Sequence, residues 1–69
     1  MKILVVGSGG REHAIIRKLK QSPKAEKIYC CPGNGGISAD AECVDIKAMD
    51  IDGVVRFSKE HNIDLVVVA

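Results

Sequence analysis

The stretch that decides the fold is residues 3–21, which read ILVVGSGGREHAIIRKLKQ. It opens with four branched apolar residues in a row, a run typical of a parallel strand that is covered on both faces. A glycine-rich break follows, and then Ile15, Ile16 and Leu19 recur at helical spacing among charged residues up to about residue 21. Strand, glycine turn and amphipathic helix together indicate the first unit of an α/β sheet.

Further strands are expected along the chain. Residues 27–31 and 63–68 are apolar runs that predict two more buried strands, and residues 42–46 predict a short strand between them. Residues 32–40 are expected to form a loop. The order predicts one α/β domain over residues 1–69, with a Rossmann-like, open and mostly parallel sheet and flanking helices.

The two helices have recognisable ends. Pro23 disfavours helical conformation at the residue before it, so the first helix should end near there. Asp50 is the expected N-cap of a second helix that contains Val54 and Phe57. Gly53 should weaken that helix by about 1 kcal/mol relative to alanine. His61 is expected near its C-terminal end, where a positive charge is favourable.

Size and charge exclude several classes of protein. Sixty-nine residues form at most one small domain, whose lone core is only marginally stable. The formal net charge of +1 gives no global field that would favour nucleic acid or a membrane surface as partner. The first apolar run is also too short for a signal peptide or a membrane span. We therefore expect neither a nucleic-acid nor a membrane partner.

Three cysteines lie in apolar, strand-like surroundings. Cys30 and Cys31 are adjacent and Cys43 is distant, so no C-x-x-C spacing for a metal or a redox pair is present. We expect reduced thiols that pack as small hydrophobic groups. This pattern suits a cytoplasmic protein.

Six of the seven glycines form two clusters, at residues 7–10 and 33–36, and each cluster directly follows a predicted strand. Carboxyl ends of adjacent parallel strands share one edge of a sheet, so the two clusters should converge on one crevice. The first cluster also begins a helix, whose free N–H groups favour an anion, and Arg11 adds donors suited to phosphate. The alternative interpretation is two tight turns without a ligand.

A dinucleotide is a poor match for this site. The G-x-G-x-x-G fingerprint requires glycine or alanine at position 12, where the chain has Glu12. It also requires an acidic residue at the end of the second strand, where Cys31 and Pro32 stand. Both departures favour a small phosphorylated molecule over NAD. His13, in the same turn as Glu12, has packing as the alternative to a functional role.

Three segments carry a resemblance to a known family. GSGGREHA at residues 7–14 matches the opening motif of the phosphoribosylamine–glycine ligase family. PGNGG at residues 32–36 resembles the Pro-Gly-Asn loop of that family, and DLVVV at residues 64–68 is similar to the strand before its Gly-Pro-Glu loop. The resemblance covers the whole chain, and the eight-residue opening motif is specific.

The resemblance implies an activity and a set of site residues. Family members join 5-phosphoribosylamine to glycine, and they convert ATP to ADP and phosphate with Mg²⁺. The N-terminal domain of the family has a pre-ATP-grasp, Rossmann-like fold that helps to bind the phosphoribosyl substrate. Carried onto this chain, the resemblance implies that the 5-phosphate is held by Gly9, Gly10 and Arg11, and that the ribose or amine lies near Glu12, His13 and Asn34.

The same resemblance places the remaining machinery elsewhere. ATP, Mg²⁺ and the catalytic groups belong to later domains of the family, so no catalytic residue, cofactor or metal is expected in this chain. Ala69 stands where the family has the glycine of Gly-Pro-Glu, which indicates a truncated N-terminal piece that is inactive alone and needs the remaining domains of its parent. The alternative from another class is a stand-alone regulatory module that binds an NAD-type nucleotide.

Overall fold

A computed structural model describes residues 1–68; Ala69, and with it the comparison to the Gly-Pro-Glu loop, lies outside the described residues. The elements follow in the order β1 (Lys2–Gly7), α1 (Gly10–Lys20), β2 (Lys27–Pro32), the 3₁₀ helix η1 (Ile37–Ala39), β3 (Glu42–Cys43), α2 (Ile51–Glu60) and β4 (Leu65–Val68). This order confirms the predicted α/β fold class.

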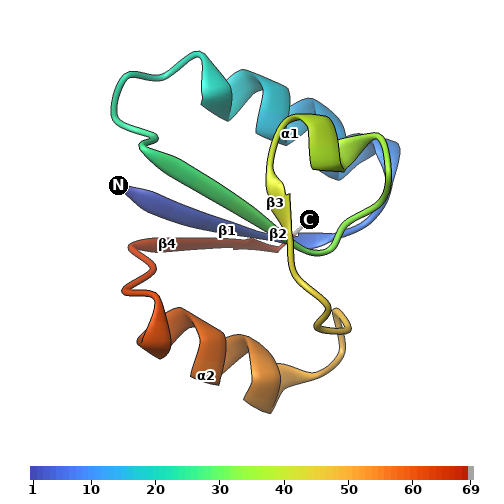
Figure 1. The fold of residues 1–69 in the computed structure, drawn as a ribbon, viewed down its shortest axis with the longest axis vertical. Coiled ribbons are helices and arrows are strands. Elements are labelled where there is room, and N and C mark those ends of the chain that lie inside the picture. The colour runs from blue at the N-terminus through green and yellow to red at the C-terminus, as the bar shows by residue number, and fades with distance from the viewer. Residues whose placement is uncertain (69) are drawn as a thin grey trace.

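The four strands form one parallel sheet in the order β3-β2-β1-β4. One helix lies on each face of the sheet, α1 above and α2 below in the view of Figure 1. The chain runs outward from β1 through β2 to β3 and then returns to the other side of β1. This return makes the carboxyl ends of β1 and β4 a topological switch point, the place where open α/β sheets bind their ligands.

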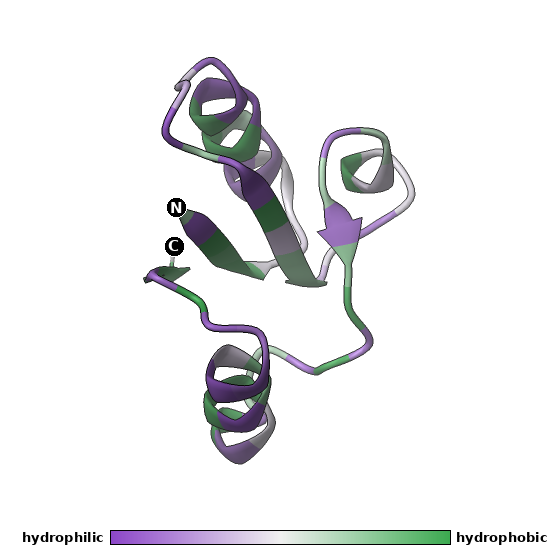
Figure 2. Ribbon diagram, turned by 60° about the vertical axis from the view of Figure 1, so that its left-hand side comes forward, coloured by the Kyte–Doolittle hydropathy of each residue, from purple (hydrophilic) through white to green (hydrophobic). Residues whose placement is uncertain are grey.

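Two apolar clusters cover the two faces of the sheet. The cluster under α1 is formed by Ile3, Val5, Ile16, Ile28, Cys30 and Ile37. The cluster over α2 is formed by Leu4, Val6, Tyr29, Cys31 and Phe57. Because both faces are covered, the two central strands read as continuous apolar runs rather than alternating ones. Figure 2 shows these strands as mostly hydrophobic and lying between two helices of mixed hydrophilic and hydrophobic residues.

Three details differ from the sequence predictions. The expected loop contains η1, β3 has two residues instead of five, and β4 begins at residue 65 instead of 63. Cys43 packs on the α1 face, whereas Val44 and Ile46 pack against the cluster on the α2 face, which is the alternation expected of a strand. The ladder to β2 nevertheless ends there, because the Ile46 N–H donates a 2.8 Å hydrogen bond to the Val44 carbonyl. The apolar pattern of residues 42–46 therefore reflects packing on both faces of the sheet, and a local turn shortens the strand to two residues.

The N-cap prediction for α2 is confirmed, and it explains the glycine inside that helix. An Asp50 carboxylate oxygen accepts a hydrogen bond of 3.0 Å from the Gly53 N–H. A Cβ atom added at Gly53 would overlap this carboxylate, lying 2.9 Å from its Cγ. Glycine thus leaves space for the cap, a gain that helix propensity alone does not include.

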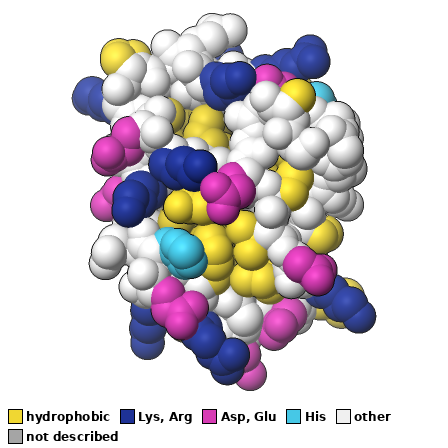
Figure 3. Space-filling model, viewed as in Figure 1, with side chains coloured by type: hydrophobic (Ala, Val, Ile, Leu, Met, Phe, Trp, Pro, Cys, Tyr) yellow, Lys and Arg dark blue, Asp and Glu magenta, His cyan; other side chains and the backbone are white. Residues whose placement is uncertain are grey.

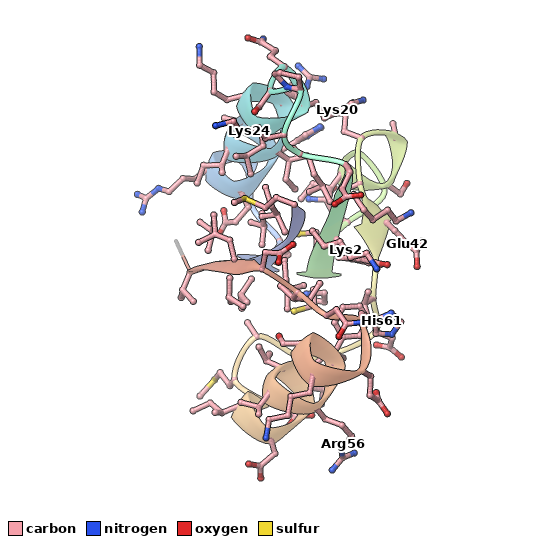
Figure 4. All side chains as sticks on the ribbon, turned by 90° about the vertical axis from the view of Figure 1, so that its left-hand side faces the viewer. Lys2, Lys20, Lys24, Glu42, Arg56 and His61 are labelled. Carbon is pink, nitrogen blue, oxygen red and sulfur yellow. The ribbon has the colours of Figure 1, made fainter. Side chains whose placement is uncertain are left out.

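At the other end of α2, His61 forms aromatic contacts. Its ring stacks on Phe57 at 4.0 Å between centroids and lies 5.6 Å from Tyr29. In Figure 4 the labelled His61 lies at the end of α2 nearest the sheet, while Arg56 points away from it. Aromatic packing therefore explains the position of His61, and a favourable interaction between a positive charge and this helix end stays a prediction.

The cysteines pack as predicted. Cys30 and Cys31 are buried, Cys43 is partly buried, and all three are free thiols. Burial in the apolar sheet raises the pKa of Cys30 to about 11 and also raises that of Cys31. A thiol with so high a pKa is a weak nucleophile, which agrees with a packing role.

The surface is mixed in character. Figure 3 shows a band of hydrophobic side chains at the level of the sheet, with charged side chains above and below it. Exposed apolar groups concentrate around the start of α2 and the edge strand β4, including Met49, Ile51, Val55 and Val68. No helix within residues 1–68 is long and apolar enough to cross a membrane.

Candidate functional site

Two glycine loops meet at the carboxyl edge of the sheet. The Gly33 N–H donates a 3.1 Å hydrogen bond to the Gly7 carbonyl, and the Asn34 amide donates to the Ser8 carbonyl. The first loop follows β1 and the second follows β2, and these neighbouring strands pair in parallel from end to end. The predicted convergence of the two clusters is confirmed.

The first loop presents the beginning of α1 without a side-chain cap. Gly9 is the N-cap residue, it has an extended backbone, and it makes no side-chain capping hydrogen bond. The first helical bond is the 3.1 Å contact from the His13 N–H to the Gly9 carbonyl. The N–H groups before His13 therefore have no acceptor within the helix, and they point out of its positive end. Arg11 is exposed in the same turn. This arrangement suits a phosphate.

Glu12 fills the space inside the first loop. A Cβ atom added at Gly7 would overlap the Glu12 side chain, and one added at Gly9 would lie 3.4 Å from its carboxylate. Gly7 has a φ of 144°, a conformation that glycine adopts without strain. In the dinucleotide fingerprint the residue at position 12 is small so that the helix packs closely on the strand. Here a carboxylate occupies that space, in line with the sequence argument against NAD.

His13 lies in a cluster of charged side chains. Its Nε2 is 2.7 Å from an oxygen of Asp40, and the two side chains are 21% and 18% exposed. Asp40 also contacts Lys20 at 2.9 Å and Arg17 at 3.5 Å. Figure 4 shows Lys20 at the end of α1, on the side of the loop that contains η1. Hydrogen bonds from Lys20 and His13 hold the pKa of Asp40 well below its ordinary range.

Asn34 connects the two loops. Its amide nitrogen donates to Ser8 of the first loop, while its carbonyl oxygen accepts a 2.9 Å hydrogen bond from the Ile37 N–H at the start of η1. Both ends of the side chain are therefore engaged within the protein. Asn34 therefore orients the two loops relative to each other, and a direct contact between Asn34 and a ligand stays a prediction.

The structure brings all the predicted site residues to one edge of the sheet. Five of them lie within the first turn of α1 and its cap, and the sixth lies across the loop contact; they are Gly9, Gly10, Arg11, Glu12, His13 and Asn34. Their individual roles toward a ligand stay predictions. Within residues 1–68, no group of three or more His, Cys, Asp or Glu side chains could hold a metal ion.

Sequence reasoning missed Asp40. It is 27 positions from His13 and lies in a segment predicted as a plain loop. No periodicity joins two residues at that distance, and the contact depends on how η1 folds against α1. An acidic residue beside the glycine cluster was the only available signal.

Comparisons with known proteins agree on one family. The family described as phosphoribosylglycinamide synthetase, N domain, matches residues 1–69. The chain is 54% identical to a phosphoribosylamine–glycine ligase of Caldanaerobacter subterraneus subsp. tengcongensis and 56% identical to one of Brucella melitensis. A third ligase, from Yersinia pestis, is 50% identical. In each case the alignment covers 99% of this chain but 16% of the relative. The chain therefore spans about one sixth of the length of these relatives.

Proposed function

The chain belongs to the phosphoribosylglycinamide synthetase N-domain family, and we propose that it forms the sugar-phosphate-binding part of a phosphoribosylamine–glycine ligase of purine biosynthesis. The observation that carries this proposal is the junction of the two glycine loops beside the uncapped start of α1. On this proposal, residues 1–69 are one incomplete substrate-binding domain, and the parent enzyme is an ATP-dependent ligase.

The 5-phosphate of 5-phosphoribosylamine would bind at the first loop. Free N–H groups at a helix start and an exposed guanidinium favour a dianionic phosphate. Gly9 and Gly10 have no side chains to keep a ligand away, and a Cβ atom added at Gly10 would have no neighbour within 4 Å. Arg11 supplies the positive charge. The position at the switch point between β1 and β4 also supports a ligand at this edge.

The ribose and its amine would lie between the two loops. Glu12 offers a carboxylate that favours an amine, and His13 lies next to the second loop, since a Cβ atom at Gly36 would be 3.6 Å from its Cε1. Asn34 would act mainly by joining the loops. None of these groups has the arrangement of a nucleophile with its base, so we assign binding and no catalytic step to this chain.

ATP and Mg²⁺ would bind to the part of the enzyme that lies outside this chain. Within residues 1–68 no group of three or more His, Cys, Asp or Glu side chains could hold a metal ion, and we assign both glycine loops to the sugar phosphate. The free thiols of the buried cysteines suit the reducing cytoplasm, where we place the parent enzyme.

The remaining domains of the parent would pack on the apolar face beside α2 and β4. An open hollow of about 460 Å³ lies there, lined by Val6, Ala48, Met49, Ile51, Val54, Val55 and Val68. Contiguous exposed apolar surface of this kind marks an interaction site. The relatives have about six times the length of this chain, which supplies a partner for that surface.

An amide NMR titration tests the proposal. The chain is titrated separately with glycinamide ribonucleotide, inorganic phosphate and NADH. Shifts at residues 9–13 and at Asn34 with the ribonucleotide, at lower concentration than with phosphate, are the expected result. Arg11→Gln should weaken ribonucleotide binding about tenfold, the value of a charged hydrogen bond. Arg56→Gln, which changes an exposed arginine of α2, should leave the affinity within about twofold. Shifts with NADH alone, or equal affinity for phosphate and ribonucleotide, would reject the proposed site.

A further inference from the structure

We propose that Asp40 is a positioning residue that fixes the His13 ring at the junction of the two glycine loops. Asp40 is the C-cap of η1, and its N–H donates a 2.8 Å hydrogen bond to the Ile37 carbonyl. Its backbone therefore belongs to the second loop, whereas His13 belongs to the first turn of α1. The contact between their side chains joins the two halves of the site.

The chemistry of the pair sets the orientation of the ring. An ionised carboxylate only accepts hydrogen bonds, so the 2.7 Å contact requires a hydrogen on Nε2 of His13. In the neutral ring, Nδ1 is then the acceptor. Nδ1 lies 3.8 Å from the position of a Cβ atom at Gly36, and Cε1 lies 3.6 Å from it. Asp40 thus turns the free ring nitrogen toward the second loop, where the ribose and amine would lie.

The remaining contacts of Asp40 allow this role to be separated from a purely structural one. Lys20 binds Oδ1 of Asp40, while His13 binds Oδ2. Removing Lys20 breaks one link between α1 and η1 and leaves the ring contact in place. Removing Asp40 breaks both of these contacts, together with the 3.5 Å contact from Arg17 to Oδ2. The variants Lys20→Met and Asp40→Ala therefore form a matched pair.

The position of the ring is measured first, without a ligand. In the unmodified chain we expect a nuclear Overhauser effect between the Cε1 hydrogen of His13 and the α-hydrogens of Gly36. It should disappear in Asp40→Ala and persist in Lys20→Met, with the amide shifts of Gly35 still dispersed in both. If Asp40→Ala does not fold, Asp40→Leu, which keeps the volume of the side chain, takes its place. A contact of unchanged strength after loss of the carboxylate would overturn the inference.

The consequence for binding rests on the function proposed above and is measured with glycinamide ribonucleotide. His13→Ala and Asp40→Ala should each weaken binding about tenfold, and the double variant should bind no more weakly than His13→Ala alone. A further tenfold loss in the double variant would show that Asp40 acts without the ring and would overturn the inference. If His13→Ala binds normally while the ring contact behaves as expected, the positioning role stands and the proposed role of His13 in binding fails.

Discussion

The two helices cover opposite faces of one sheet, but the two faces differ in how completely their apolar side chains are buried. On the α1 face, Ile16 and Ile37 are fully buried, and Asp40 joins the helix to the second loop through hydrogen bonds. On the α2 face, Phe57 is the buried residue of the helix, whereas Ile51 is 73% exposed. The comparison teaches that both apolar packing and hydrogen bonds hold α1 in place, whereas α2 leaves part of its apolar surface exposed.

The same substitution on each face gives the largest expected contrast. Ile16→Ala removes a fully buried side chain from the α1 cluster, so it should lower the free energy of unfolding by about 3 kcal/mol. Ile51→Ala removes an exposed side chain and should change it by less than about 0.5 kcal/mol. Urea denaturation followed by circular dichroism measures both values.

A small domain has little stability to lose, so Ile16→Ala is expected to be largely unfolded at 25 °C. In that case the transition is measured in a stabilising osmolyte such as trimethylamine N-oxide, with both variants under the same conditions. Equal losses for the two variants would break the comparison, because they would show that Ile51 is buried in the isolated chain.

The second glycine loop gives an intermediate effect on the α1 face. Gly33 has a φ of 70°, and a Cβ atom there would overlap the thiol of Cys43 and lie 3.6 Å from Cys30. Gly33→Ala should therefore lower the free energy of unfolding by about 2 kcal/mol through backbone strain and crowding. Gly35 has an ordinary backbone and open space around it, so Gly35→Ala should change stability by less than about 0.5 kcal/mol. Thermal unfolding of the two variants side by side provides the measurement, and a similar melting temperature for both would contradict the assigned strain.

Most of the fold could be predicted because its signals are local. The apolar run of β1, the glycine break after it and the Asp50 cap each lie within a few neighbouring residues. The two glycine clusters also predicted the edge at which the two loops meet, since parallel strands place their carboxyl ends together. These local signals predicted β1 and the capped start of α2 correctly.

What the sequence did not predict depends on contacts between distant residues. The strand β3 pairs with β2 only over Glu42 and Cys43, and the apolar pattern of residues 42–46 does not show where this pairing ends. The hydrogen bond between His13 and Asp40 and the engagement of both ends of Asn34 need the second loop in its folded place. The sequence therefore predicted that the candidate site residues share one edge of the sheet, whereas the contacts that orient them were found in the structure.

The smallest expected effect is a pH dependence confined to the α1 face. Lys20 and His13 hold the pKa of Asp40 below its ordinary value, so the ionised carboxylate stabilises the folded state. Such a contribution is fully present above the unfolded pKa of about 4 and is lost as the pH falls through the lower folded value. Asp40→Asn should therefore be less stable than the unmodified chain at pH 7, and the difference should shrink steadily below about pH 4.

Lys20→Met should also weaken the fall of stability at acid pH, because it removes the largest cause of the lowered pKa of Asp40. Unfolding free energies from urea titrations between pH 2 and pH 7 test this pH dependence. Because the partners of Asp40 on α1 are partly exposed, the stability difference between Asp40→Asn and the unmodified chain should also shrink in 1 M salt. If the unfolding free energies of Asp40→Asn and the unmodified chain changed in parallel with pH, the carboxylate would be no better stabilised in the folded state than in water. The hydrogen bonds of Asp40 would then not distinguish the α1 face from the α2 face.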